Sequence, residues 1–396
     1  MQGVDFTLEP GERMGLVGES GCGKTTTALA IMGLLPPNAS AGGRILLDGT
    51  DVLAGGEATM RPHRWIDIAI VFQGAMNALN PVRTIGAQIV EALELHAVQG
   101  VGFTLEPGER MGLVGESGCG KTTTALAIMG LLPSSASAAG RILLDGKDLL
   151  AGGETTMRPH RWIDIAIVFQ GAMNALNPVR TIGAQIVEAL ELHDVAQGAA
   201  ARAEVADLLE AVGIPRQRAS RYPHELSGGM RQRAAIAMAL SCKPKVLIAD
   251  EPTTALDVMV QAQILELLDG LCRDFGLALV LVTHDLPVVA QLCDKAVVMY
   301  AGKVVERASV DDLYHRPRHP YTRLLFAATP DLDDLEQPIA SIPGAPPRLD
   351  RPLVGCPFRP RCDRAFDRCA TEAPVLVTLP DGRAASCHLD EAAITA

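Results

Sequence analysis

Two kinds of apolar spacing alternate along most of the chain. Compact apolar runs predict buried strands. One such run ends at Val114, and the others cover Arg141–Leu144, Ile163–Phe169, Val246–Ala249 and Leu277–Thr283. Apolar residues at helical spacing predict helices over Lys121–Leu132, Ala199–Val212, Arg231–Leu240 and Ile264–Phe275. Strands that alternate with helices predict an α/β fold with a mostly parallel sheet that is covered on both faces.

One long segment of this pattern occurs twice. Residues 3–96 recur as 100–193, with seven differences in 94 positions, and removing one copy of 97 residues leaves 396 − 97 = 299. A tandem duplication and an artefact of sequence assembly both produce such a repeat. Past residue 330 the chain becomes rich in proline and cysteine. We therefore expect three parts, at 1–97, 98–330 and 331–396.

Composition narrows the function classes. The formal net charge of −11 argues against a nucleic-acid partner, because phosphate binding needs a basic surface. No apolar run approaches the roughly 18–20 residues that span a bilayer, and the first residues lack a signal-peptide layout. We therefore expect any membrane association to occur through another protein. The nine cysteines, an odd number, occur in a large chain without a signal-peptide layout, which favours a reducing cytosol over a disulfide scaffold.

One segment fits the phosphate-binding pattern G-x-x-x-x-G-K-[ST] at every fixed position. Its glycines let backbone N–H groups wrap phosphates at the start of a helix, where the helix dipole favours anions. The lysine supplies positive charge for the β- and γ-phosphates, and the threonine hydroxyl is a Mg²⁺ ligand. The segment is Gly115-Glu116-Ser117-Gly118-Cys119-Gly120-Lys121-Thr122. The same octet occurs in the first copy, with fixed positions Gly18, Gly23, Lys24 and Thr25.

A second candidate lies at the end of a predicted strand. Val246–Ala249 is apolar and runs directly into Asp250 and Glu251. The carboxyl end of a parallel strand is where nucleotide binds in open α/β folds. Asp250 is suited to hold the Mg²⁺ shell, and Glu251 to polarise an attacking water as general base. The plain alternative is an ordinary strand end, which the phosphate-binding loop upstream disfavours.

A third element is Ser227-Gly228-Gly229, which precedes a predicted helix. Ser227 is suited to cap that helix, while the two glycines leave N–H groups open to an anion. With the neighbouring Leu226 and Met230, these residues resemble the signature of ABC ATPases. Asp250-Glu251 then resembles the Walker B pair, Ala255-Leu256-Asp257 the D-loop, Gln170 the Q-loop glutamine and His284 the switch histidine.

The resemblance implies a P-loop NTPase with a mostly parallel core, an antiparallel β subdomain, a helical signature subdomain and a small Cys-rich extension. It implies ATP as substrate, with Glu251, His284 and Gln170 in catalysis and Thr123 beside the phosphate-binding loop. Thr122, Gln170 and Asp250 are the implied Mg²⁺ ligands. Two such domains close head to tail, so that Lys121 and Glu251 of one face Ser227, Gly228 and Gly229 of the other across ATP.

The C-terminal part narrows the family further. Motifs that resemble oligopeptide, dipeptide and nickel importer ATPases include Gln261–Leu265, His319–Arg323 and Gly355–Phe358. That branch implies a second ATPase subunit, two transmembrane permeases and an extracytoplasmic solute-binding protein. It places the chain peripherally on the cytoplasmic face of the cell membrane and favours peptide as the solute. The alternative is a non-catalytic or impaired ABC-like module left by the duplication.

The two phosphate-binding loops compete for one site. The first copy has Gln73 but no signature, no Walker B carboxylates and no switch histidine. If it replaced the second copy, about 97 residues would loop out, at a cost on the order of 4 kcal/mol. We therefore expect Lys121, not Lys24, to bind ATP. Neither copy is preceded by the aromatic residue that stacks on adenine in the family.

Four cysteines gather near the C-terminus with spacing C-x5-C-x6-C-x17-C, at Cys356, Cys362, Cys369 and Cys387. Unlinked thiols, a zinc site and a [4Fe–4S] cluster are the three alternatives. The tight C-x2–4-C pairs of structural zinc sites are absent, whereas four thiolates suffice for the cluster. The resembling branch has a similar cysteine tail, and a cluster is attributed to some of its members.

Overall fold

The computed structural model divides into two compact units, residues 1–82 and 83–396. Its described residues are 98–133, 136–172, 175–254, 256–328, 342–347 and 353–389, and in the first unit 4–8, 14–15, 23–31, 35, 39, 41–47, 49–54 and 59. The first unit contains a helix and a two-stranded hairpin: α1 (Lys24–Ile31), β1 (Leu46–Leu47) and β2 (Thr50–Asp51).

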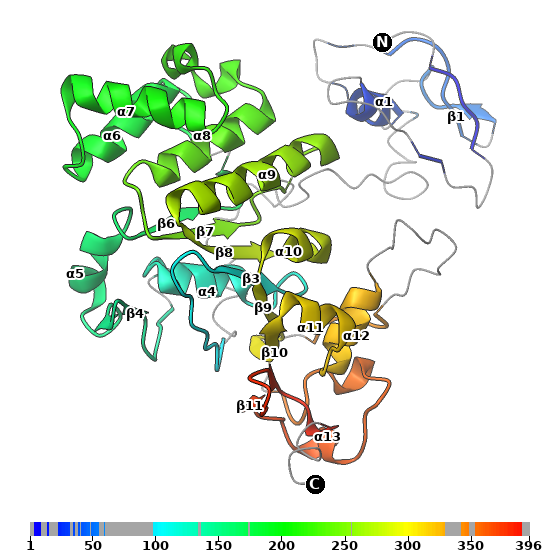
Figure 1. Cartoon of the computed structure of the whole chain (residues 1–396). Helices are drawn as coiled ribbons and strands as arrows, with labels where there is room; N and C mark the ends of the chain where they lie inside the picture. The colour runs from blue at the N-terminus through cyan, green and yellow to red at the C-terminus, as the bar shows by residue number, and fades with distance from the viewer. Residues whose placement is uncertain are drawn as a thin grey trace. The chain divides into compact units, whose positions relative to one another are not determined.

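The second unit contains the predicted alternation of strands and helices (Figure 1). Its strands are β3 (Arg110–Val114), β4 (Leu143–Leu144), β5 (Lys147–Asp148), β6 (Ile165–Val168), β7 (Val246–Asp250), β8 (Ala278–Thr283), β9 (Lys295–Tyr300), β10 (Lys303–Ser309), β11 (Val377–Thr378) and β12 (Ala384–Ala385). Its helices are α4 (Lys121–Ile128), α5 (Gly153–Met157), α6 (Ile182–Leu192), α7 (Gly198–Ala211), α8 (Gly228–Leu240), α9 (Val258–Phe275), α10 (Leu286–Leu292), α11 (Val310–His315), α12 (Pro320–Ala327) and α13 (Arg368–Thr371).

One sheet organises this unit, in the order β11-β12-β10-β9-β3-β8-β7-β6. The strands from β9 to β6 in that order pair in parallel, whereas β10, β12 and β11 pair antiparallel. Strands β4 and β5 form a separate antiparallel hairpin. The α/β fold with a mostly parallel core is therefore confirmed.

Both faces of the sheet are covered, as β8 illustrates. All six of its residues are buried. Val280 and Val282 pack in the cluster with α4, while Leu279 and Leu281 pack in the larger cluster with α8, α9 and α10. Because successive side chains of a strand point to opposite faces, a strand buried on both sides has no polar alternation. This explains why the strand sequences are continuous apolar runs.

Several predicted boundaries differ in the structure. Helix α8 begins at Gly228 rather than Arg231, and α9 begins at Val258 rather than Ile264. Helix α4 ends at Ile128 rather than Leu132, because Gly130 adopts a left-handed conformation with φ 61° and the Leu131 N–H returns to the Leu126 carbonyl. The run Arg141–Leu144 forms only the short strand β4. The cysteine-rich extension also joins this sheet, because β12 pairs with β10. Among the described helices, none is long and apolar enough to cross a membrane.

Candidate functional site

The loop between β3 and α4 is shaped by glycines that no other residue could replace. Gly115 has φ 148°, and a Cβ there would lie 2.2 Å from the Met299 carbonyl oxygen. Gly120 has φ 100°, and its Cβ would lie 2.7 Å from a methyl group of Val98. Positive φ and close backbone approach both exclude a side chain. The predicted phosphate-binding loop therefore has the geometry that its glycines imply.

Lys121 begins α4 and folds back over this loop. Its Nζ donates to the carbonyl oxygens of Gly115 at 2.7 Å and Glu116 at 3.1 Å, and the residue is only 6% exposed. A buried ammonium group needs such partners, because burying an unpaired charge is costly. Phosphate oxygens would compete with these carbonyls for the same three N–H bonds. The charge is thus held at the loop in the absence of nucleotide.

Two oxygen ligands meet at the ends of neighbouring elements. The Thr122 hydroxyl on α4 donates to the Asp250 carboxylate at the end of β7, at 3.3 Å. Asp250 is 1% exposed, and this burial raises its pKa from 3.8 to about 6 despite the bond from Thr122. Hydroxyl and carboxylate oxygens are ligands that Mg²⁺ prefers, and a cation would favour the ionised form of Asp250. The pair therefore fits a Mg²⁺ site.

Glu251 gathers the remaining predicted catalytic side chains. One carboxylate oxygen accepts from the Gln170 amide and from the Thr254 hydroxyl, both at 2.8 Å. The other oxygen lies 2.9 Å from Nδ1 of His284. Three segments that are distant in sequence, after β6, β7 and β8, thereby meet at one carboxylate at the carboxyl edge of the sheet.

The backbone conformation and the pKa of Glu251 both differ from the ordinary values. Its φ is 47°, in the left-handed region that non-glycine residues seldom adopt and that costs on the order of 1–3 kcal/mol. Its N–H donates to the Val282 carbonyl at 2.8 Å, which holds this conformation. Burial raises the pKa of Glu251, but the bonds from His284 and Thr254 outweigh burial and leave the pKa below its ordinary value. Glu251 is therefore ionised at neutral pH, as a base must be.

The signature residues form a separate feature. The Ser227 hydroxyl caps α8 by accepting from the Met230 N–H at 3.3 Å, as predicted. A Cβ on Gly229 would lie 2.6 Å from a methyl group of Val260, so the backbone is closely packed there. No hydrogen bond among the described residues joins Ser227, Gly228 or Gly229 to the loop 115–122. In the D-loop, Asp257 caps α9, and Ala255 lies outside the described residues.

In the first copy, Gly23 precedes α1 and Lys24 begins it, like their counterparts in the second copy. Thr25 lies in the same helix, whereas Gly18 and Gln73 lie outside the described residues. The described part of residues 1–97 carries no carboxylate equivalent to Asp250 or Glu251. The prediction that Lys121 and not Lys24 binds ATP stays a prediction.

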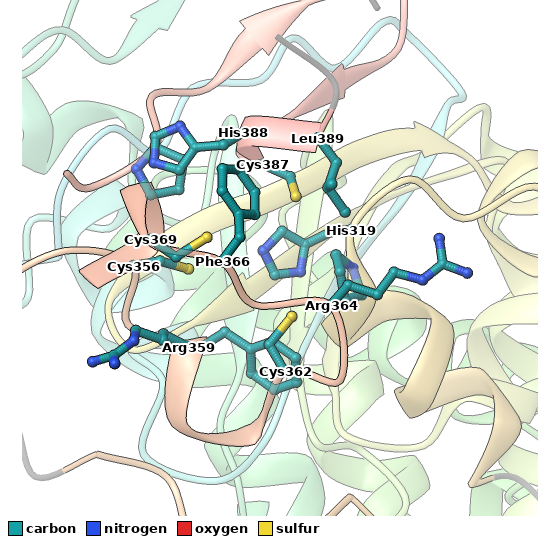
Figure 2. Close-up of a pocket in the computed structure, with 13 residues that line it drawn as sticks. His319, Cys356, Arg359, Cys362, Arg364, Phe366, Cys369, Cys387, His388 and Leu389 are labelled. Atoms are coloured by element: carbon teal, nitrogen blue, oxygen red, sulfur yellow. The ribbon is translucent and has the colours of Figure 1, made fainter. Parts of the chain in front are cut away.

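The four C-terminal cysteines come together. Cys356, Cys362, Cys369 and Cys387 line one pocket, together with His319, Phe358 and His388 (Figure 2). Burial raises the pKa of Cys356 and Cys362, so both thiols are protonated in this form. Within the described part of the chain, however, no group of three or more Cys, His, Asp or Glu side chains has an arrangement that could hold a metal ion. The four thiols line one pocket but are not arranged as a metal site in this structure, and the cluster stays a prediction.

Sequence analysis missed three residues of this site. Thr254 follows Glu251 by three residues, a spacing at which a turn returns a hydroxyl to the carboxylate. Tyr321 accepts from the Glu116 N–H at 2.9 Å, and Arg361 donates to the Glu116 carboxylate. Tyr321 and Arg361 lie 205 and 245 positions after Glu116, and nothing in the sequence indicated that they contact it.

Comparison with known proteins confirms the resemblance to ATP-binding proteins of ABC transporters. The ABC transporter family model matches residues 1–94 and 98–254, and the model for the oligopeptide/dipeptide transporter C-terminal region matches 305–369. The chain is 49% identical to a probable peptide ABC transporter ATP-binding protein of Sinorhizobium fredii, over 74% of this chain and 88% of that protein.

Two further relatives have similar coverage. The oligopeptide transport ATP-binding protein AppD of Bacillus subtilis is 48% identical over 74% of this chain and 91% of its own length. The dipeptide transport ATP-binding protein DppD of Escherichia coli is 46% identical over 76% of this chain and 94% of its own length. A solved dimeric structure of a bacterial ABC transporter cassette covers 53% of this chain and 89% of that one, at 29% identity and a TM-score of 0.47.

Proposed function

This chain belongs to the ATP-binding proteins of ABC transporters, in the family with an oligopeptide/dipeptide C-terminal region, and we propose that it energises import of di- or oligopeptides. It is an ABC-type ATPase. The observation that carries the proposal is the Glu251 carboxylate, which is ionised and held by Gln170, Thr254 and His284 beside Asp250 and Thr122. The relatives give no support to the impaired-module alternative.

The proposed roles follow from this geometry. The loop 115–122 and Lys121 bind the phosphates of ATP, with Thr123 beside them in the first turn of α4. Thr122, Asp250 and Gln170 would hold Mg²⁺, which neutralises phosphate charge when bound. Glu251 accepts the proton of the attacking water, because its lowered pKa keeps it ionised. His284 bonds to Glu251 and thereby orients its carboxylate.

The site is completed by a second subunit. Ser227, Gly228 and Gly229 make no hydrogen bond to the loop 115–122 within the described part of this chain. The open N–H groups at the start of α8 suit the γ-phosphate bound to another copy or to a related ATPase. We therefore propose a head-to-tail pair that acts on two permeases at the cytoplasmic face of the membrane, with a solute-binding protein outside.

We also propose the domain bounds 1–97, 98–330 and 331–396, with the first part dispensable for catalysis. The support is that the described residues of 98–389 contain all eight strands of the described sheet and the three side chains that contact the Glu251 carboxylate. A chain that lacks residues 1–97 should hydrolyse ATP at the rate of the full chain. A rate reduced tenfold or more at equal stability would assign a role to the first copy.

Transport itself is tested by reconstitution. The full chain is isolated from its native membrane, its co-purifying subunits are identified, and the complex is placed in proteoliposomes. We expect two permeases and peptide-stimulated ATP hydrolysis with uptake of labelled peptide. The Glu251→Gln variant should assemble equally and transport nothing. Stimulation by a metal ion or another small solute, and not by peptide, would overturn the substrate class.

The cluster prediction has its own test. Its support is that four thiols line one pocket, with Arg359 and Arg364 at its rim (Figure 2). Protein purified without oxygen should be brown and contain roughly four irons per chain. Replacing Cys356 and Cys362 by serine should remove the colour. Colourless protein, with or without zinc, would contradict an iron–sulfur cluster.

A further inference from the structure

Glu116, in the phosphate-binding loop, is held by the C-terminal extension. Both terminal nitrogens of Arg361 donate to its carboxylate, Nη1 to Oε2 at 2.7 Å and Nη2 to Oε1 at 2.9 Å. The two residues are 245 positions apart in sequence. A guanidinium that donates two parallel bonds to one carboxylate is the strongest and most directional form of ion pair. The contact therefore fixes the orientation of the Glu116 carboxylate.

The arginine is itself rigidly held. Its side chain is only 4% exposed. Its Nε donates to the Pro343 carbonyl at 2.8 Å, and Nη1 also lies 3.3 Å from the Tyr300 hydroxyl. Burying such a pair costs desolvation energy, so the pair stabilises the fold no more than a pair of apolar residues in its place would. What the pair supplies is a fixed geometry at the loop.

An aromatic cluster braces the same loop from behind. Tyr300 at the end of β9, Tyr321 on α12 and Phe358 in the extension are fully buried. Their ring centroids lie 4.7 to 5.4 Å apart. The Tyr321 hydroxyl accepts the backbone N–H of Glu116 at 2.9 Å. Both the side chain and the backbone of Glu116 are thus attached to residues beyond position 300.

Glu116, which Arg361 and Tyr321 hold, also contacts Lys121, the residue proposed to bind phosphate. Lys121 donates to the Glu116 carbonyl at 3.1 Å, on the same residue that Arg361 and Tyr321 hold. A shift of Glu116 would move the carbonyls that position the Lys121 ammonium group. Errors of about 1 Å in such groups are enough to impair a site. The loop is consequently positioned by contacts that the nucleotide never touches.

We propose that Arg361 is a positioning residue for ATP binding, which makes the C-terminal extension a structural part of the nucleotide site. The inference rests on the proposed binding of ATP to the loop 115–122. It also bears on the repeat, because the sequence has Glu19 and Glu116 at equivalent positions but one Arg361. Only one of the two glutamates can be held in this way at a time.

The test measures the dissociation constant of a fluorescent ATP analogue with the full chain. Arg361→Met, which keeps the length and removes the charge, should weaken binding about tenfold. Glu116→Gln should weaken nucleotide binding by a similar factor. This variant removes the same contact from the partner residue, which lies in the loop and not in the cysteine-rich extension. The double variant should be no weaker than either single variant, because both remove one interaction. Arg361→Lys, which keeps charge without the planar fork, should restore part of the affinity.

Arg383 supplies the matched control. It lies in the same extension, its side chain is 8% exposed, and it pairs with Asp381 and Asp312 rather than with the loop. Arg383→Met should lower thermal stability as Arg361→Met does, yet leave nucleotide affinity unchanged. Equal affinity losses in both variants, or additive losses in the double variant, would overturn the positioning role. If the unmodified chain itself fails to bind the analogue, the assignment of ATP to loop 115–122 fails instead.

Discussion

The two copies of the repeat have nearly the same sequence and only partly the same structure. The octapeptide Lys-Thr-Thr-Thr-Ala-Leu-Ala-Ile forms helix α1 in the first copy and α4 in the second. Asp51 and Asp148 each accept from the N–H groups two and three residues on, beside the hairpins β1–β2 and β4–β5. These elements depend on hydrogen bonds within a short segment, so they form in both copies.

The strand before the phosphate-binding loop behaves differently. Met111 lies in β3 between β8 and β9 and is 2% exposed. Its counterpart Met14 is 45% exposed and lies in no strand. Val4, Phe6 and Leu8 are likewise 41–54% exposed. The difference shows that a central parallel strand requires partners from a distant part of the chain, which β8 and β9 supply to one copy.

The largest effect should come from a residue with no counterpart in the first copy. Glu251→Gln should reduce ATP hydrolysis about 10²–10⁴-fold, because it removes the proposed general base, while ATP binding persists. Steady-state hydrolysis and nucleotide binding measure the two effects. Glu266→Gln, on an exposed position of α9, is the control and should hydrolyse normally. A native rate in Glu251→Gln would remove Glu251 from catalysis.

The two equivalent lysines give the sharpest comparison. Lys121→Ala should lower hydrolysis about 10²–10³-fold, the loss expected when one donor to a developing charge is removed. Lys24→Ala should leave the rate within about twofold. The same assay on both variants decides which copy binds ATP. Greater damage from Lys24→Ala would show that the first copy occupies the site.

Alanine variants of Met111 and Met14 compare a buried position with its exposed counterpart in the other copy. Met111→Ala should lower the free energy of unfolding by about 2–5 kcal/mol, because it leaves a cavity in the core. Met14→Ala should change it by less than about 0.5 kcal/mol, as expected for an exposed position. Denaturant unfolding of both variants provides the measurement. Equal losses would indicate that the first copy has a core of its own.

The pH dependence of stability isolates Asp250, which the first copy lacks. Its folded-state pKa is raised from 3.8 to about 6, so the folded nucleotide-free protein binds this proton more tightly than the unfolded chain. Its contribution is therefore complete below about pH 4 and is lost as pH rises to about 6, a change of about 3 kcal/mol. The Asp250→Asn variant should lack this slope. An unfolding free energy with equal pH dependence in both proteins would contradict the shift.

Much of the site could be predicted from local sequence. Gly115 to Thr122 specify a loop and a helix start, and Ser227 caps α8, because these features rest on bonds within a few residues. The apolar runs that end at Val114 and at Ala249 indicated buried strands correctly. The end of the second run also placed Asp250 and Glu251 at the carboxyl edge of the sheet, where the structure has them. Family resemblance supplied the roles that spacing alone could not.

Contacts between distant segments could not be predicted. Nothing near Arg361 in sequence indicates that it binds Glu116, and nothing in the C-terminal segment indicates that β12 joins the sheet beside β10. Met14 and Met111 have the same flanking residues, yet only Met111 is buried. Local patterns determine which helices and turns can form, because those bonds are short in sequence. Strand pairing, burial and the support of the nucleotide loop depend on surfaces that exist only once the chain has folded.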